Sequence, residues 1–128
     1  MMETMLLAGE TAFDIDLLCS LVPEGLIAEV HDKTGGMRHL MIKTPTQFVA
    51  QIQACGEEGD ADTMDDLKRM ENQPPEFADA LERRSLRFLL VTYADSEEDN
   101  LQRITYAFLQ ADLVKFSCSS TDEIEELG

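Results

Sequence analysis

The sequence predicts an α+β fold: a single domain with a small mixed or antiparallel sheet, including a hairpin over residues 26–43, packed against three to four helices. Three observations predict it. Apolar and polar residues alternate on both sides of Gly35-Gly36, and several other segments carry apolar residues at helical spacing. The apolar fraction of 44% in 128 residues is enough for one core. We expect residues 1–118 to form this domain and residues 119–128 to form an acidic, flexible tail.

The first thirty residues contain one secure element. Residues 5–8 are apolar, but the run is too short to distinguish a strand from another structure. Asp14 is a good N-cap, and the leucines and valine that follow it have helical spacing until Pro23 interrupts the pattern. We therefore expect a helix over residues 14–22.

The hairpin over residues 26–43 is the most specific structural prediction. If residues 34–36 form a three-residue loop, with Gly36 in the left-handed conformation, the register of the two strands follows. A slip by one residue would put the apolar side chains of the two strands on opposite faces. The register aligns apolar with apolar and acid with base: Val30 with Leu40, Ala28 with Ile42, and Asp32 with Arg38.

Residues 44–55 have the pattern of a capped helix. Thr44 suits the N-cap, Pro45 suits the first helical position, and Gln47 can complete a capping box. The apolar residues that follow have helical spacing and predict its buried face: Phe48, Val49, Ile52 and Cys55.

The second half of the chain predicts a strand, a helix and a strand, preceded by another helix. Residues 75–84 have a helical pattern after a proline pair, and residues 86–93 contain the apolar run of a strand buried on both faces. Residues 96–111 begin with acids suited to the positive end of a helix. Residues 113–118 form the expected last strand, with a right-handed crossover if the two strands are parallel.

The charge is the strongest functional signal. The chain has 26 Asp and Glu against 10 Lys and Arg, a formal net charge of -16, and its first 32 residues contain no Lys or Arg. Nucleic acid and anionic membrane surfaces repel such a protein, so we expect it to bind neither directly. Three separated cysteines, no apolar run long enough to span a membrane and no signal-peptide pattern favour the reducing cytoplasm.

No catalytic motif is present, so we expect a non-enzymatic protein without a cofactor. The hairpin register places His31 opposite His39, and two imidazoles at that spacing can hold a metal ion, with Glu29 as the only third ligand in reach. The more ordinary interpretation is two half-exposed strand residues. We therefore predict no metal site.

The candidate binding residues are two groups of acids. Carboxylates three or four positions apart on a helix lie about 5–6 Å apart, the scale of a row of phosphates. Such a surface can occupy a basic groove that normally holds nucleic acid. The partner is then a basic protein surface, on a nucleic-acid-handling protein or complex, and the predicted contact residues are Glu57, Glu58, Asp60, Asp62, Asp65, Asp66, Asp95, Glu97, Glu98 and Asp99.

In size, acidity and lack of a catalytic site the chain is similar to small inhibitors such as anti-CRISPR proteins, anti-restriction proteins and immunity proteins against nuclease toxins. The similarity is one of type, without a shared motif, and it implies inhibition by nucleic-acid mimicry. The composition also resembles that of type III secretion chaperones, so a chaperone-like or adaptor function is the alternative. The sequence is compatible with a homodimer.

Overall fold

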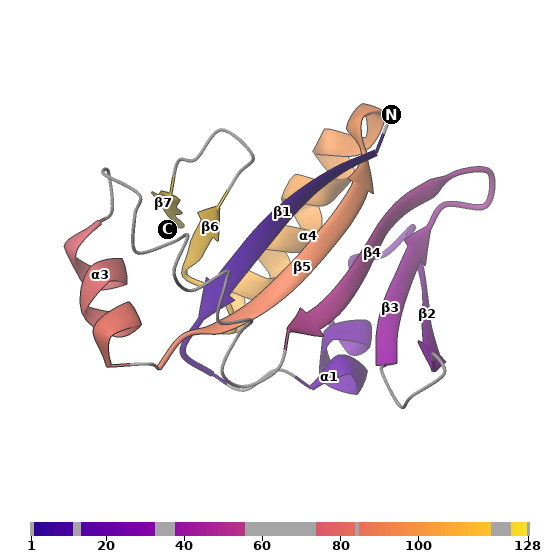
Figure 1. The fold of residues 1–128 in the computed structure, drawn as a ribbon. Helices are drawn as coiled ribbons and strands as arrows, with labels where there is room; N and C mark the ends of the chain where they lie inside the picture. The colour runs from indigo at the N-terminus through magenta and orange to yellow at the C-terminus, as the bar shows by residue number, and fades with distance from the viewer. Residues whose placement is uncertain are drawn as a thin grey trace.

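The fold is built on one antiparallel sheet. A computed structural model describes residues 2–11, 14–32, 38–55, 74–83, 85–118 and 124–127, and within them seven strands lie in the order β2-β3-β4-β5-β1-β6-β7 (Figure 1). The strands are β1 (Met2–Gly9), β2 (Ile27–Asp32), β3 (Arg38–Lys43), β4 (Phe48–Cys55), β5 (Arg87–Ala94), β6 (Phe116–Cys118) and β7 (Ile124–Glu126). The helices are α1 (Ile15–Ser20), α3 (Pro75–Glu82) and α4 (Glu98–Gln110), and a 3-10 turn, η1 (Asp95–Glu97), precedes α4.

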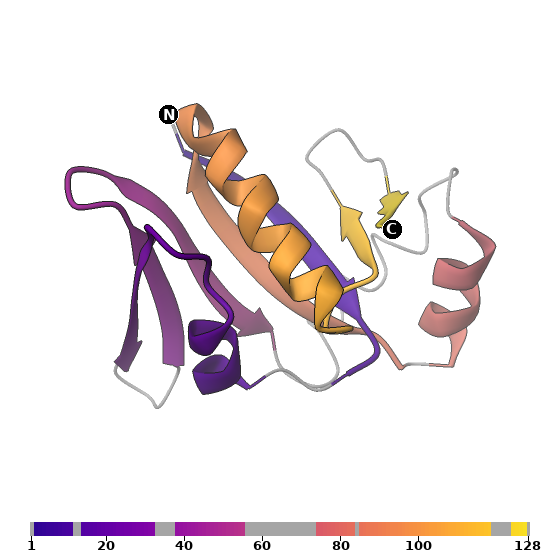
Figure 2. The same ribbon diagram turned by 180° about the vertical axis from the view of Figure 1, so that it is seen from behind.

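The predicted packing of the sheet against three to four helices is wrong. Among the described residues only α3 and α4 exceed two helical turns, and α1 has six residues. Helix α4 crosses one face of the sheet along β1 and β5, and α1 lies near β2 and β3 (Figures 1 and 2). Helix α3 lies at the edge of the sheet that β6 and β7 form (Figure 1). The sheet is therefore the dominant layer, and one long helix covers its centre.

The predicted helix over residues 44–55 is the main cause of this error. Thr44 does act as a local cap, since its Oγ1 accepts hydrogen bonds from the backbone N–H groups of Thr46 and Gln47. Its own N–H, however, donates to the carbonyl of Gln47 at 2.8 Å and closes a turn between β3 and β4. Residues 48–55 then pair with β3 on one side and β5 on the other, and this pairing overrides the helical spacing.

The pairing of β4 with β3 explains why the apolar residues of β4 do not show the alternation of a strand. A bulge at Ile42 and Lys43 shifts the pairing of β3 with β4. Val49 and Ala50 are both fully buried, although neighbouring residues of a regular strand point to opposite faces. The bulge and the burial of both faces hide the period of two that would have indicated a strand.

The hairpin register is confirmed. Strand β2 pairs with β3 so that Val30 lies opposite Leu40, Ala28 opposite Ile42 and His31 opposite His39. Its connecting loop, residues 33–37, lies outside the described residues. Asp14 also caps α1 as predicted, because its Oδ1 accepts the N–H of Asp16 at 3.0 Å.

Strand β1 occupies the position that links the two halves of the sheet. It pairs with β5 along its whole length and with β6 over Leu6–Ala8. Because both neighbours are antiparallel to β1, β5 and β6 are parallel to each other, and α4 connects them across β1 (Figure 2). The predicted strand, helix and strand are therefore present, with β1 between the two strands.

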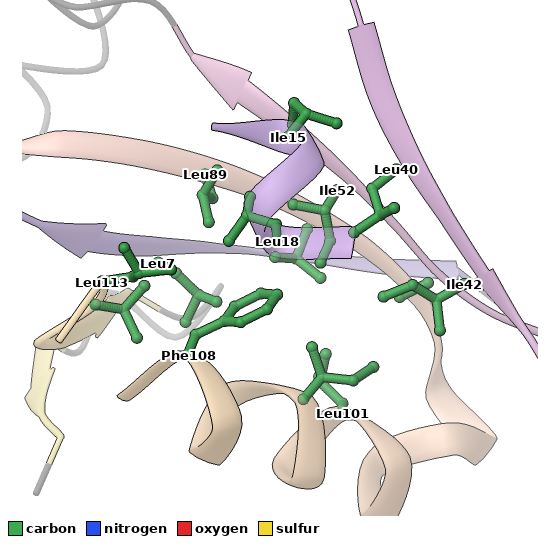
Figure 3. Packing of buried hydrophobic residues seen from close by; sticks show 14 of the residues in the cluster. Leu7, Ile15, Leu18, Leu40, Ile42, Ile52, Leu89, Leu101, Phe108 and Leu113 are labelled. Carbon is green, nitrogen blue, oxygen red and sulfur yellow. The ribbon is translucent and has the colours of Figure 1, made fainter. Parts of the chain in front are cut away.

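The core has one cluster on each face of the sheet. Leu101, Ile104 and Phe108 lie at helical spacing on α4 and pack onto the first face, where α1 adds Ile15 and Leu18 (Figure 3). On the second face Phe77 of α3 meets Phe116 edge to face, with ring centroids 5.2 Å apart. Burial on both faces explains the continuous apolar run of β5.

Candidate functional site

The structure places four of the predicted contact residues at the start of α4. Glu57, Glu58, Asp60, Asp62, Asp65 and Asp66 lie outside the described residues. Asp95, Glu98 and Asp99 are exposed in η1 and the first turn of α4, where carboxylates are favoured by the positive end of the helix. Asp95 is three and four positions before the other two, so the three carboxylates share one side of this turn.

Glu97 differs from its three neighbours. Its side chain is only 9% exposed, and its Oε2 accepts a hydrogen bond from the amide of Asn100 at 2.7 Å. The Glu97 carboxylate is therefore used inside the fold, and the surface at this end of α4 is formed by the other acids.

Glu3 of β1 adds a carboxylate that the sequence analysis did not select. The hydroxyl of Tyr93 donates to Oε2 of Glu3 at 3.1 Å. Burial of the ring, this hydrogen bond and the charges of Glu3, Glu98 and Asp95 raise the pKa of Tyr93 above its usual value of 10.0. We call the acids Glu3, Asp95, Glu98 and Asp99 the α4 patch.

A second acidic group lines a cleft beside α3. The cleft has a volume of about 760 Å³, and the side chains of Glu76, Asp79 and Glu82 lie along it at three-residue spacing. Because residues three apart share a side of a helix, these carboxylates form a continuous row. We call Glu76, Asp79 and Glu82 the α3 row.

Basic side chains near this cleft are held by one acid. Oε1 of Glu10 accepts from Arg83 at 2.9 Å and from the hydroxyl of Ser85 at 2.7 Å, and its Oε2 lies 3.5 Å from the Lys115 amine. The Ser85 hydrogen bond and then the two positive charges lower the pKa of Glu10, with burial acting in the opposite direction. Glu10 thus pairs with two cations that line the cleft, Arg83 and Lys115.

Two other basic side chains also pair with acids. Arg38 makes a bidentate pair with Asp16 of α1, with N–O distances of 2.9 and 3.1 Å. Lys43 lies 2.9 Å from Glu29. Arg38 also lies opposite Asp32 in the register of the hairpin, as predicted.

Glu126 of β7 lies against the α3 row. A hydrogen bond with Glu76, and then the negative charge of Glu76, raise the pKa of Glu126 above its usual value of 4.5. Two carboxyl groups are held together here, so one binds a proton more readily than an isolated glutamate. This contact brings two acids of the described surface together.

We expect the Glu126→Gln substitution to stabilise the protein at pH 7 and to have no such effect at pH 4. The pKa of Glu126 is raised in the folded state, so the repulsion with Glu76 weakens the fold increasingly as the pH rises through that pKa. Thermal unfolding of the wild type and the variant between pH 4 and 7 measures the difference.

Glu125→Gln is the matched control for this prediction. It removes the same charge one position away in β7, where the side chain points to the other face of the strand. An equal stabilisation by the two substitutions at pH 7 would show that overall charge is responsible and would contradict a specific contact.

The two histidines of the hairpin stack on each other. Their ring centroids lie 5.6 Å apart with the planes 23° from parallel, and Nε2 of His31 lies 3.1 Å from Oε2 of Glu29. His39 is only 8% exposed, unlike the half-exposed residue that was predicted. Across the described parts of the chain, no group of three or more His, Cys, Asp or Glu side chains is arranged to hold a metal ion.

The comparisons with known proteins identify no relative. No family model, no curated protein sequence and no solved structure matches this chain. In the described residues, no helix is long and apolar enough to cross a membrane. The chemistry of the surface is therefore the basis for a functional proposal.

The α3 row was readable from the sequence, but its contact with Glu126 was not. The spacing of Glu76, Asp79 and Glu82 within a predicted helix puts the three acids on one side. They do not stand in a dense acidic run, and the predicted contact residues all do. Glu126 reaches Glu76 because β7 pairs with β6 next to α3, and a three-residue strand has too little pattern to predict such pairing.

Proposed function

We propose that this protein is a non-enzymatic inhibitor whose carboxylates occupy the basic nucleic-acid-binding groove of a partner protein. The partner belongs to the nucleic-acid-handling proteins of the cytoplasm, and the protein itself binds neither nucleic acid nor membrane. The net charge of -16 supports this, since it steers association toward a basic surface and away from other polyanions.

The contact between Glu76 and Glu126 is the observation that carries the proposal. The hydrogen bond with Glu76, and then the negative charge of Glu76, raise the pKa of Glu126, and the two carboxylates repel each other when both are ionised. An arginine or lysine side chain from a partner would neutralise the two carboxylates and convert the repulsion into attraction. Binding of a cationic side chain would therefore remove the repulsion between these two acids.

The α3 row repeats on the same scale as the phosphates of a nucleic-acid strand. Residues three apart rise about 4.5 Å along a helix axis. Phosphates of B-DNA rise about 3.4 Å per nucleotide along each strand. A row of lysines or arginines that contacts successive phosphates can therefore contact Glu76, Asp79 and Glu82 in turn.

The α4 patch is the second contact surface in this proposal. Glu3 and Glu98 come from different elements and converge on Tyr93, so the patch is fixed by the fold rather than by one flexible segment. It lies at the end of β1 and β5 that is away from α3 (Figure 1).

We expect the triple variant E76Q/D79N/E82Q to bind its partner at least about tenfold more weakly than the wild type. The test immobilises the full chain, captures basic proteins from a lysate of its host and measures the affinity of each for the wild type and the variant. Binding should also weaken steeply with added salt, and duplex DNA or RNA should compete with it.

The triple variant E24Q/E29Q/D112N is the charge-matched control, since it removes three acids that lie outside both patches. Its affinity should stay within about threefold of the wild type. Equal losses in the two variants would show that only total charge matters. An affinity that ignores both salt and nucleic acid would rule out mimicry altogether.

A further inference from the structure

An apolar groove runs between α4 and the β6 side of the sheet. Its volume is about 310 Å³, and its walls come from Leu101, Tyr106 and Leu109 of α4, Met5 of β1 and Leu127 after β7. Tyr106 is 62% exposed, whereas Phe108 on the same helix is fully buried. A large aromatic side chain is therefore presented to solvent at the edge of an apolar surface.

Strand β1 continues beside this groove beyond the end of its pairing with β6. Within the described chain β6 pairs with Leu6–Ala8 only, whereas β5 pairs with all of β1, from Met2 to Gly9. Among the described strands, residues 2–5 therefore pair with β5 alone.

The end of the groove near residues 2–5 is acidic. Glu3 lies two positions before Met5 on the same face of β1, and Glu98 lies one helical turn before Leu101. Both carboxylates act on the hydroxyl of Tyr93, which shows that they converge at this end. The groove therefore combines apolar walls with a negative terminus.

We propose that this groove docks an extended segment of a partner protein in which apolar side chains alternate with basic ones. The apolar side chains of the segment contact Tyr106 and Leu109, and a lysine or arginine reaches Glu3 and Glu98. This docking surface shares Glu3 and Glu98 with the α4 patch, but it is separate from the α3 row and does not depend on nucleic-acid mimicry.

Two properties of the surface favour this occupant. A volume of about 310 Å³ is at the low end of ligand pockets, which span roughly 300–1000 Å³, so it accepts a few side chains and not a folded element. A second copy of the chain would bring another net charge of -16 to the acidic end. A segment with basic side chains has the complementary charge.

The test uses two fluorescein-labelled peptides with the same positive charge. Leucine and lysine alternate in the first, and serine and lysine alternate in the second. Fluorescence anisotropy measures their affinity for the full-length wild type and for three variants: Tyr106→Ala in the groove, Glu98→Gln at its acidic end, and Gln110→Ala as an exposed control on the same helix. Thermal unfolding verifies that each variant is folded.

We expect the leucine peptide to bind the wild type at least about tenfold more tightly than the serine peptide. Tyr106→Ala should remove most of this difference, Glu98→Gln should make the salt dependence shallower, and Gln110→Ala should change neither. The variant E76Q/D79N/E82Q should keep the preference for leucine, which separates this test from that of the proposed function.

Three outcomes would overturn the inference. Equal affinity for the two peptides would mean that charge alone attracts them. An unchanged affinity in Tyr106→Ala would place the leucine contacts elsewhere. A wild-type dimer in sedimentation experiments that Tyr106→Ala converts to a monomer would make a second copy of the chain the occupant.

Discussion

Replacing Gly9 with alanine is expected to cost at least about 3 kcal/mol of folding stability. Gly9 ends β1 where the chain leaving α4 passes over it, and a Cβ atom there would overlap the backbone carbonyl of Leu113. Two backbone hydrogen bonds keep Leu113 from moving away freely. The N–H of Leu113 donates to the carbonyl oxygen of Phe108 at 3.0 Å, and the N–H of Lys115 donates to the carbonyl oxygen of Ala8 at 2.7 Å. Since domains of this kind are stable by roughly 5–15 kcal/mol, this loss should lower the denaturation midpoint greatly.

Gly25→Ala is the control for the effect of adding one methyl group. Gly25 has a φ of 90°, and a Cβ there would meet no atom within 4 Å. Its cost is then limited to the backbone strain of a positive φ, about 1–2 kcal/mol. Urea denaturation of both variants gives the comparison, and a smaller loss in Gly9→Ala than in Gly25→Ala would contradict the close approach.

Replacing Phe108 with alanine is expected to destabilise the protein by about 3–5 kcal/mol. The ring is fully buried at the centre of the larger core cluster, where Leu7 of β1 and Leu113 lie close to it (Figure 3). Its removal leaves a cavity between α4 and the middle of the sheet. Urea denaturation monitored by circular dichroism should show a midpoint far below that of the wild type.

Tyr106→Ala is the matched control on the same helix. The Tyr106 side chain is 62% exposed, so its removal should change the free energy of unfolding by no more than about 0.5 kcal/mol. If the two alanine variants lost similar stability, α4 would not be oriented with Phe108 toward the sheet.

The sequence predicted the elements whose pattern is set locally. The hairpin register followed from the alternation of apolar residues and the glycine turn, and α4 followed from the spacing of Leu101, Ile104 and Phe108. The helix predicted for residues 48–55 was wrong because the structure of this segment depends on pairing with β3 and β5, which lie elsewhere in the chain. The cap-like Thr44 and the bulge at the end of β3 made the local pattern look helical.

The acidic surface was predictable in amount but only partly in position. Net charge and the acids at the start of α4 are sequence properties, and Asp95, Glu98 and Asp99 are exposed as a binding surface requires. Glu97 is buried and accepts a hydrogen bond from Asn100, whereas Glu3 comes close to the start of α4 because it accepts a hydrogen bond from Tyr93. The position of Glu3 depends on β1 lying beside β5, and the local sequence around Glu3 does not predict this pairing.

The position of β1 has a consequence for how the protein is synthesised. Gly9 pairs with Arg87, 78 positions later in the chain, and Met2 pairs with Ala94. During translation these first residues leave the ribosome long before their main partner strand exists. The apolar side chains of β1 are exposed throughout that interval, and the contact order of the sheet is high. The centre of the sheet can therefore assemble only after β5 has been synthesised, and the larger core cluster only after α4 has followed.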